Sequence, residues 1–202
     1  MWKKDIIYFF SPKGPQLDSN TIIVDDEITL LVDPGTSSRS YLKRILGETG
    51  NSLEEVDIVL NTHGHYDHFQ GNTYFPEAEK IAFYPDSEDI SEETSEDIRA
   101  IKKESVLSTG KLDFRILHTP GHSMGSCCLY LPGEVLVCGD LVLAEGSFGR
   151  VDLKGGSFDE LKRSIKRLCD LDFEHLLPGH GGVGNKNSVR RALSFVERSG
   201  FQ

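Results

Sequence analysis

One short stretch of the chain combines three imidazoles with a carboxylate. Residues 62–68 read Thr-His-Gly-His-Tyr-Asp-His and follow an apolar, β-branched run at residues 56–60. Such a run predicts a buried strand, so the stretch should leave the edge of a sheet as a loop. Alternate side chains of an extended loop point the same way, which sends His63 and His65 toward one point, with Asp67 following on that side. Imidazole and carboxylate oxygen are ligands of divalent metals, so the stretch predicts a metal site.

Two other structures of this stretch are less consistent with its residues. A helix would bring His63 and Asp67 together instead, but Gly64 and the absence of a capping signal favour a loop, with His68 beginning the turn away. The residues could also be ordinary solvated loop residues. Three of the seven histidines of the chain fall within this stretch, however, and this concentration favours the metal site.

Three later loops carry side chains of the same chemistry, each after an apolar run. They contain His122, Asp140 and His180, which all follow a glycine. Loops at the ends of strands can converge at one edge of a sheet, and seven nitrogen and oxygen ligands suffice for two metals that share a bridging carboxylate. His118 is expected to be structural near the site, and Asp33 to cap the turn into the next helix.

Length, charge and cysteine content narrow the class of protein. At 202 residues and 22.5 kDa, the chain is expected to form a single domain over residues 1–202. A net charge of −10 disfavours a nucleic-acid partner. Four cysteines without paired spacing, a short N-terminal apolar run and the lack of a membrane span indicate a cytoplasmic protein without a membrane partner.

Predicted strands precede the metal-ligand loops. Apolar runs bounded by turn residues predict strands at residues 2–10, 21–24, 28–32, 56–60, 80–83, 114–117, 126–131, 135–138 and about 175–177.

Helices are predicted between the strands. One begins at Ser37 or Ser38, one at the capping box of Ser157, and one runs from about Ser188 to Gly200. Residues 85–104 are rich in Asp, Glu and Ser, and fit either a thinly anchored helical lid or a mobile acidic loop, with the loop favoured.

These motifs resemble those of the metallo-β-lactamase superfamily. The matching residues are the stretch 62–68, Thr-Pro-Gly-His-Ser at 119–123, Gly-Asp at 139–140, Pro-Gly-His-Gly at 178–181 and an early Asp-Pro-Gly at 33–35. They stand in the family's order and span nearly the whole chain. The resemblance implies an α/β (α+β) fold, a four-layer αββα sandwich with a metal site at one edge of its two sheets.

The resemblance also assigns roles to the predicted ligands. It gives His63, His65 and His122 to one metal, Asp67, His68 and His180 to a second, and makes Asp140 the bridge between the two. Two divalent ions are implied, with zinc expected and iron or manganese as alternatives. A hydroxide bridging them would attack an ester or thioester carbonyl, with Asp67 and Asp140 as the catalytic carboxylates.

Residues 146–156 are similar to a loop of glyoxalase II-like hydrolases, which cleave hydroxyacyl thioesters of glutathione. This implies a small anionic thioester or ester substrate, held by Arg150 and Lys154 and oriented by Tyr66. Glyoxalase II has an additional C-terminal helical domain that contributes to glutathione binding, for which this sequence leaves no room. Alternatives within the superfamily are a mononuclear iron persulfide dioxygenase, a lactonase and a phosphodiesterase.

Overall fold

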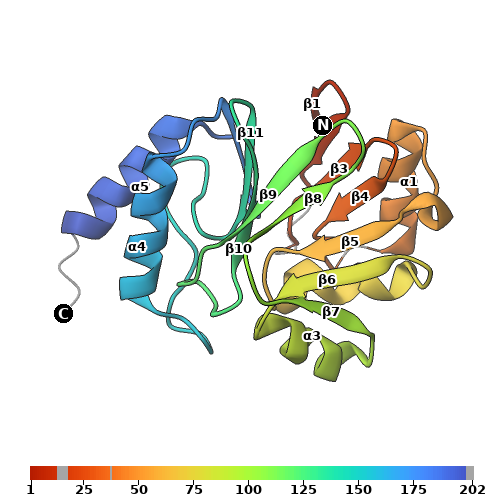
Figure 1. Ribbon diagram of the computed structural model, residues 1–202, viewed down its shortest axis with the longest axis horizontal. Helices are drawn as coiled ribbons and strands as arrows, with labels where there is room; N and C mark the ends of the chain where they lie inside the picture. Colours follow the sequence, from red (N-terminus) through yellow and green to blue (C-terminus); the bar gives the residue numbers. More distant parts are fainter. Residues whose placement is uncertain (13–17, 37, 199–202) are drawn as a thin grey trace.

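Two β-sheets packed face to face form the centre of the molecule. The computed structural model describes residues 1–12, 18–36 and 38–198. A seven-stranded sheet has the order β1-β2-β3-β4-β5-β6-β7, and a five-stranded sheet has the order β12-β11-β10-β9-β8. Helices α1 and α3 lie outside the first sheet, and α4 and α5 lie outside the second (Figure 1). This is the predicted four-layer αββα sandwich.

The first sheet comes from the N-terminal half of the chain. Strands β1 to β4 are antiparallel neighbours, whereas β4 to β7 run parallel. The strands are β1 Trp2–Lys4, β2 Ile7–Phe10, β3 Thr21–Asp25, β4 Thr29–Val32, β5 Ile58–Asn61, β6 Glu79–Phe83 and β7 Ile98–Ile101. The helices of this half are α1 Arg39–Thr49, α2 Tyr66–Phe69 and α3 Asp86–Thr94, with 3-10 turns at Leu53–Glu55 and Gln70–Tyr74.

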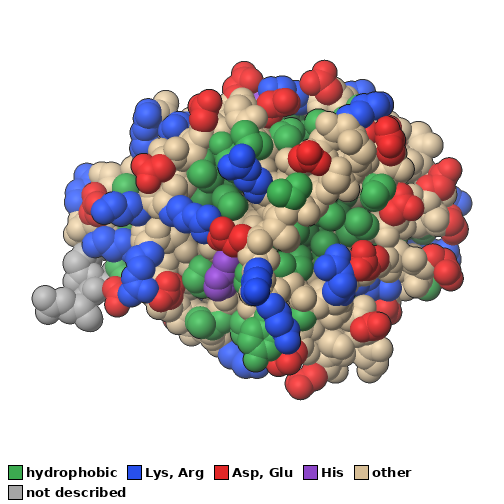
Figure 2. Space-filling view, in the orientation of Figure 1, with side chains coloured by type: hydrophobic (Ala, Val, Ile, Leu, Met, Phe, Trp, Pro, Cys, Tyr) green, Lys and Arg blue, Asp and Glu red, His purple; other side chains and the backbone are tan. Residues whose placement is uncertain are grey.

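The second sheet comes from the C-terminal half. Its neighbours are antiparallel except for β11 and β12, which are parallel. The strands are β8 Ser105–Ser108, β9 Asp113–His118, β10 Cys127–Leu131, β11 Val135–Gly139 and β12 His175–Pro178, and the helices are α4 Phe158–Cys169 and α5 Lys186–Arg198. On the face shown in Figure 2, charged side chains of both signs are interspersed over the helical layers.

The side chains of each strand point alternately into the core between the sheets and into the core beneath the helices. In β3, Ile22 and Val24 enter the core between the sheets, whereas Ile23 packs toward α1. In β11, Val137 enters the same inter-sheet core and Leu136 packs against α4 and α5. Burial on both faces explains why these strands are apolar throughout, and each fully buried side chain contributes about 1.5–3 kcal/mol to stability. The core between the sheets and the two cores beneath the helices hold the strand ends rigidly, which positions the loops that follow them.

The N-terminal run was predicted as one strand, and this was wrong. Asp5 has a positive φ of 50°, and the chain turns there so that Lys4 pairs with Ile7 across a β1–β2 hairpin. Asp tolerates this conformation better than most non-glycine residues, but a single Asp without a neighbouring glycine or proline is a weak turn signal in the sequence.

The preference for a mobile loop over residues 85–104 was also wrong. The segment contains α3 and β7, and β8 follows immediately. Its few apolar residues are sufficient because Ile90 and Ile98 are buried together with Phe69 and Ala82. The acidic residues between them reduced the apparent periodicity without preventing this packing.

The remaining helix boundaries follow the sequence closely. Ser38 caps α1 by accepting a hydrogen bond from the N–H of Tyr41 at 3.3 Å, while Ser37 lies outside the described residues. The last helix, α5, begins slightly before Ser188, and the expected stop at Gly200 also lies outside them. Within the described part of the chain, none of the helices combines the length and apolar character that crossing a bilayer requires.

Candidate metal centre

The predicted ligands lie at one edge of the sandwich. His63 and His65 follow β5, His122 follows β9, Asp140 follows β11 and His180 follows β12. Tight turns bring these loops together. Gly139 has φ +49°, and a Cβ on it would lie 2.6 Å from Thr62 Oγ1, so only glycine fits between these loops.

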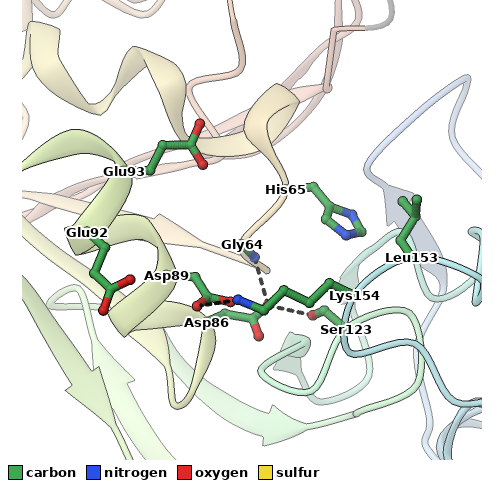
Figure 3. Close-up of a pocket in the computed structure, with 9 residues that line it drawn as sticks. All are labelled: Gly64, His65, Asp86, Asp89, Glu92, Glu93, Ser123, Leu153 and Lys154. Atoms are coloured by element: carbon green, nitrogen blue, oxygen red, sulfur yellow. Dashed lines mark hydrogen bonds and ion pairs between the residues drawn. The ribbon is translucent and has the colours of Figure 1, made fainter.

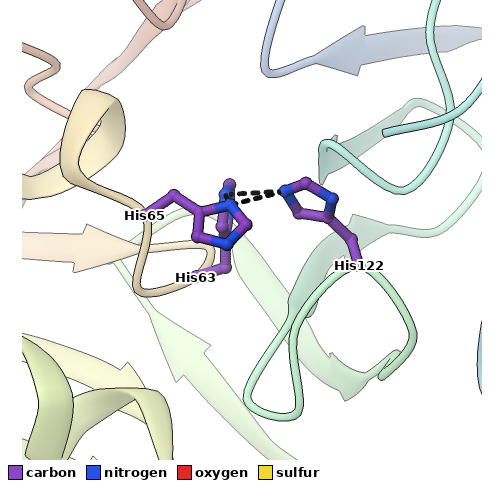
Figure 4. Close-up of side chains that lie close together, drawn as sticks. All are labelled: His63, His65 and His122. Carbon is purple, nitrogen blue, oxygen red and sulfur yellow. Dashed lines mark hydrogen bonds between the residues drawn. The ribbon is translucent and has the colours of Figure 1, made fainter. Parts of the chain in front are cut away.

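Three histidines form the first group of ligands. His65 Nδ1 lies 3.1 Å from His63 Nε2 and 2.8 Å from His122 Nε2, and the latter two nitrogens are 3.2 Å apart. Figure 4 shows the three rings directed at one point from two separate loops. The side chains of His63 and His122 are buried, with 1% and 3% exposure.

The hydrogen bonds on the far side of these rings fix where their protons lie. His122 Nδ1 is 2.6 Å from the carbonyl oxygen of Arg150, which can only accept, so the proton is on Nδ1. The hydroxyl of Thr62 donates to Asp33 and therefore accepts from His63 Nδ1 at 3.1 Å. Neutral His63 and His122 thus present unprotonated Nε2 atoms to each other at 3.2 Å. A shared cation fits this arrangement, whereas two lone pairs alone repel.

The second group contains Asp67, His68 and His180. His180 Nε2 lies 3.1 Å from Asp67 Oδ2, and His68 Nε2 lies 3.8 Å from the same oxygen. One ligand atom from each of the three residues falls within 4.8 Å of the others.

Asp140 lies between the two groups. Its Oδ2 is 3.7 Å from His122 Nε2 and 3.5 Å from His180 Nε2, and its Oδ1 is 3.6 Å from His68 Nε2. Both Asp140 Oδ1 and His68 Nε2 are buried without a hydrogen-bond partner among the described residues. Such orphaned polar atoms cost free energy unless a ligand pairs with them. A divalent ion between them meets this need, so the donor set fits the metals that the family resemblance implies.

The loop geometry expected for residues 63–68 was only partly right. His63 and His65 do converge, but a short helix, α2, begins at Tyr66 with His65 as its N-cap. The helical turn directs Asp67 away from the first group and toward His180, on the same side as His68. The sequence lacked a side-chain cap, and His65 indeed makes no side-chain capping hydrogen bond.

Asp33 supports the centre, and its expected role as a turn cap was incomplete. Its Oδ1 accepts from the N–H of Thr62 at 2.8 Å, and its Oδ2 accepts from the Thr62 hydroxyl at 2.7 Å. The same Oδ2 accepts from His68 Nδ1 at 2.8 Å, which leaves His68 Nε2 free to face Asp140. A carboxylate behind a histidine in this way orients the ring and increases the basicity of its other nitrogen.

The surroundings of the histidines give them different pKa values. Burial, and then the charges of neighbouring histidines, lower the pKa of His63 well below its usual value. Burial lowers the pKa of His122 to about 4. Burial opposes a charge on His68, but Asp33, Asp140 and Asp67 together raise its pKa to about 9. The first group is therefore neutral at pH 7, the state in which imidazole binds metals.

The carboxylate of Asp67 stays ionised. Burial acts to raise its pKa, but the hydrogen bond from His180 and the charges of His68 and His180 lower it to about 2. The second group therefore combines an ionised carboxylate with two histidines.

Two of the predicted substrate contacts lie away from the histidines. Arg150 is 68% exposed and forms an ion pair with Asp152, so only its backbone carbonyl reaches the centre. Tyr66 is 49% exposed and lines a different cavity, together with Phe69 and Tyr74.

Lys154 lines a cavity of about 550 Å³ that opens beside His65 (Figure 3). Its ammonium forms an ion pair with Asp89 at 3.0 Å. Helix α3 supplies most of the opposite wall, including Asp86, Asp89, Glu92 and Glu93. A helical lid over residues 85–104 is the less favoured of the two predictions from sequence, because no motif links these residues to the predicted ligands.

Fold and ligand arrangement define a class of protein: an αββα sandwich with a His- and Asp-lined candidate metal centre at the edge of its sheets. A family model described as the metallo-beta-lactamase superfamily matches residues 14–180. The chain belongs to this superfamily.

Known proteins agree with this assignment. The probable metallo-hydrolase YqgX of Bacillus subtilis is 31% identical over 190 residues, covering 84% of this chain and 88% of that protein. The crystal structure of a metallo-beta-lactamase family protein from Thermus thermophilus superposes with a TM-score of 0.81 at 22% identity, covering 96% of this chain and 79% of that one. The crystal structure of TTHA1623 in a di-iron-bound form gives a TM-score of 0.76 at 28% identity, covering 93% and 99%.

Proposed function

We propose that this protein is a binuclear metal-dependent hydrolase that cleaves the carbonyl bond of a small thioester or ester, as glyoxalase II-like enzymes do. The proposal depends mainly on the position of Asp140. Its two oxygens face His68, His122 and His180, so one carboxylate contacts both groups of ligands at 3.5–3.7 Å. The names of relatives such as the probable metallo-hydrolase YqgX support hydrolytic chemistry.

Two divalent ions would be held by the residues already described. The first would bind His63, His65 and His122, the second would bind Asp67, His68 and His180, and Asp140 would contact both. Zinc suits this set of nitrogen and oxygen ligands, and iron is an alternative because TTHA1623 has a di-iron-bound form. When bound, such ions lower the pKa of a water molecule and polarise a carbonyl oxygen.

Asp67 is the carboxylate best placed to accept a proton. Its side chain is 27% exposed, against 13% for Asp140, so water entering the site can reach it. His180 holds Asp67 Oδ2 at 3.1 Å and thereby orients the other oxygen. Asp67 is ionised at pH 7 and can accept a hydrogen bond from the attacking water.

The charge of the cavity wall affects which substrates can bind beside the metal centre. Four carboxylates line the cavity beside His65, and the ammonium of Lys154 that faces them is already paired with Asp89. An anionic group would be repelled there unless it displaced Asp89 from Lys154. We therefore propose a substrate that presents a neutral or cationic group to this wall, in place of the anionic substrate expected from sequence.

The proposal is tested with a panel of acyl thioesters, aryl esters, lactones and a phosphodiester. The protein is stripped with a chelator and reconstituted with zinc, iron or manganese. Turnover of thioesters or esters only after reconstitution is the expected result. A protein that binds two metals yet cleaves no member of the panel would overturn the proposal, and oxygen uptake with a persulfide would support the dioxygenase instead.

A further inference from the structure

We propose that Asp86 is a positioning residue of the metal centre, which ties the loop of His63 and His65 to the loop of His122. The proposal rests on the metal centre described above and deepens it. Asp86 is neither a predicted ligand nor part of a motif. It begins α3, directly after β6, and its side chain is 4% exposed.

The carboxylate of Asp86 accepts hydrogen bonds from both ligand loops. Its Oδ2 accepts from the N–H of Gly64, at 2.7 Å, and from the hydroxyl of Ser123, at 2.5 Å. Its Oδ1 accepts from the N–H of Gly125 at 2.7 Å. Gly64 lies between His63 and His65, and Ser123 follows His122 directly. Figure 3 shows Asp86 below the cavity, joined to Gly64 and Ser123.

Two glycines make this close approach possible. A Cβ on Gly64 would lie 3.1 Å from the Cβ of Asp86, and one on Gly125 would lie 2.6 Å from it. A side chain at Gly125 would therefore displace the carboxylate from both loops. The sequence thus leaves room for Asp86 at the two points where the loops contact it.

The ligands of the first group need a contact that holds their two loops together before a metal binds. The first three ligands hold their ring nitrogens 2.8–3.2 Å apart, and the nitrogens of His63 and His122 both lack protons. Apart from the hydrogen bond between His65 Nδ1 and His122 Nε2 at 2.8 Å, these ring contacts bring lone pairs together, so without a cation they contribute little to holding the two loops in place. Charge-assisted hydrogen bonds from backbone N–H groups to Asp86 hold the loops together and the ligands ready for the metal.

The charge of Asp86 is essential to this role. An ionised carboxylate accepts hydrogen bonds at both oxygens, which suits the three donors that surround it. An amide of the same shape has one accepting oxygen and an NH2 group. Asp86→Asn would direct that NH2 group either at the N–H of Gly125, which removes one of the two contacts to the loop of His122, or at the N–H of Gly64, which removes the contact to the loop of His63 and His65.

The test measures metal affinity and ligand geometry apart from catalysis. Metal-free wild type, Asp86→Asn and Asp89→Asn are titrated with zinc against a chromophoric chelator, and their cobalt(II) forms are compared by visible absorption. Asp89 is the matched control because it lies on the same helix and cavity wall but bonds to Lys154 rather than to a ligand loop. We expect Asp86→Asn to weaken the tighter site by about 10–100-fold and to change the cobalt spectrum. Asp89→Asn should match wild type.

A second variant keeps the test decisive if Asp86→Asn fails to fold. Ser123→Ala removes only one hydroxyl donor, and we expect it to weaken the tighter site by about tenfold, the effect of one hydrogen bond to a charged group. Wild-type affinity and spectrum in Asp86→Asn, or in Ser123→Ala where the first does not fold, would overturn the role of Asp86. Failure of wild type itself to bind metal would instead overturn the proposed function.

Discussion

Asp33 accepts a hydrogen bond from His68 Nδ1 at 2.8 Å, and both side chains are almost fully buried. The contact places the proton of His68 on the side away from the ligand groups. His68 Nε2 therefore faces Asp140 and Asp67, at 3.6 Å and 3.8 Å, where a bound metal would take the place of the second proton that the raised pKa of His68 favours. The same Asp33 carboxylate binds Thr62, the residue before His63, so one buried aspartate orients ligands of both groups.

Asp33→Asn should weaken metal binding without unfolding the protein. His68 Nδ1 and the N–H of Thr62 bond to different oxygens of Asp33, and an amide has only one accepting oxygen, so either His68 or the loop of His63 loses its support. We expect affinity at the second site to fall by about 10–100-fold. The measurement is the number of metals retained per chain after dialysis at a fixed low zinc concentration. Asp113→Asn, on an exposed residue of β9, is the control, and equal retention in all three proteins would show that Asp33 has no such role.

Asp140→Ala and His122→Ala should each remove nearly all activity while the fold persists. Both residues belong to the strand-end loops rather than to the apolar cores, so far-ultraviolet circular dichroism should be unchanged. We expect kcat/KM to fall on the order of 10³-fold, comparable with the loss of a single group that stabilises transition-state charge. A variant that keeps a near-normal kcat after metal reconstitution would refute the assignment of that residue.

Substrate charge should affect the rate. Acetylthiocholine, S-propyl thioacetate and S-acetyl-3-mercaptopropanoate carry the same acetyl group with a cationic, neutral or anionic thiol. The acidic wall formed by α3 should favour the first two, with about a tenfold lower kcat/KM for the anion that shrinks as salt is added. The double substitution of Glu92 and Glu93 by Gln should reduce the difference. Preference for the anion would instead indicate that Lys154 exchanges Asp89 for the substrate.

Asp26 connects the two sheets and should make stability depend on pH. Its Oδ2 accepts from the hydroxyl of Thr109 at 2.9 Å and from the N–H of Lys111 at 2.8 Å. Burial acts to raise the pKa of Asp26, but its hydrogen bonds outweigh this and lower the pKa below 3.8. A group with a lowered pKa in the folded state stabilises the protein above its unfolded pKa, and this stabilisation is lost as pH falls through the folded value.

Asp26→Asn should therefore lower the free energy of unfolding by about 1 kcal/mol at pH 7 and by less below pH ~4, since solvent screens a half-buried carboxylate. Urea denaturation at pH 7 and pH 3 measures the difference. The same loss at both pH values would mean that the ionised carboxylate contributes nothing beyond the shape of the side chain.

The sequence sufficed to bring the ligands together because each one follows an apolar strand. Loops at strand ends can converge, so the sequence predicts that His63, His122, Asp140 and His180 come together, although their strands belong to two different sheets. The roles of Asp33 and Asp86 were not predictable in this way. Their partners are Thr62, 29 residues from Asp33, and Gly125, 39 residues from Asp86. Backbone amides carry no side-chain signal, and such contacts leave no periodic pattern.

The sequence also favours a loop at two places where the structure has a helix. The turn of α2 begins at Tyr66 without a capping side chain, and α3 is anchored mainly by the burial of Ile90. Both depend on tertiary packing, which overrides weak local preferences. Loop spacing alone therefore predicts the wrong side for Asp67, whereas the family resemblance groups it with His68 and His180 as the structure does. The acidic wall of the cavity is likewise a helix where the sequence favours a mobile loop.

The proposed function requires that one chain holds two metal ions, both in contact with Asp140. Plasma mass spectrometry on protein reconstituted with zinc and dialysed against metal-free buffer tests this most directly. We predict two equivalents of zinc per chain in wild type, and at most one in Asp140→Ala. A single equivalent or none in folded wild type would contradict the binuclear centre.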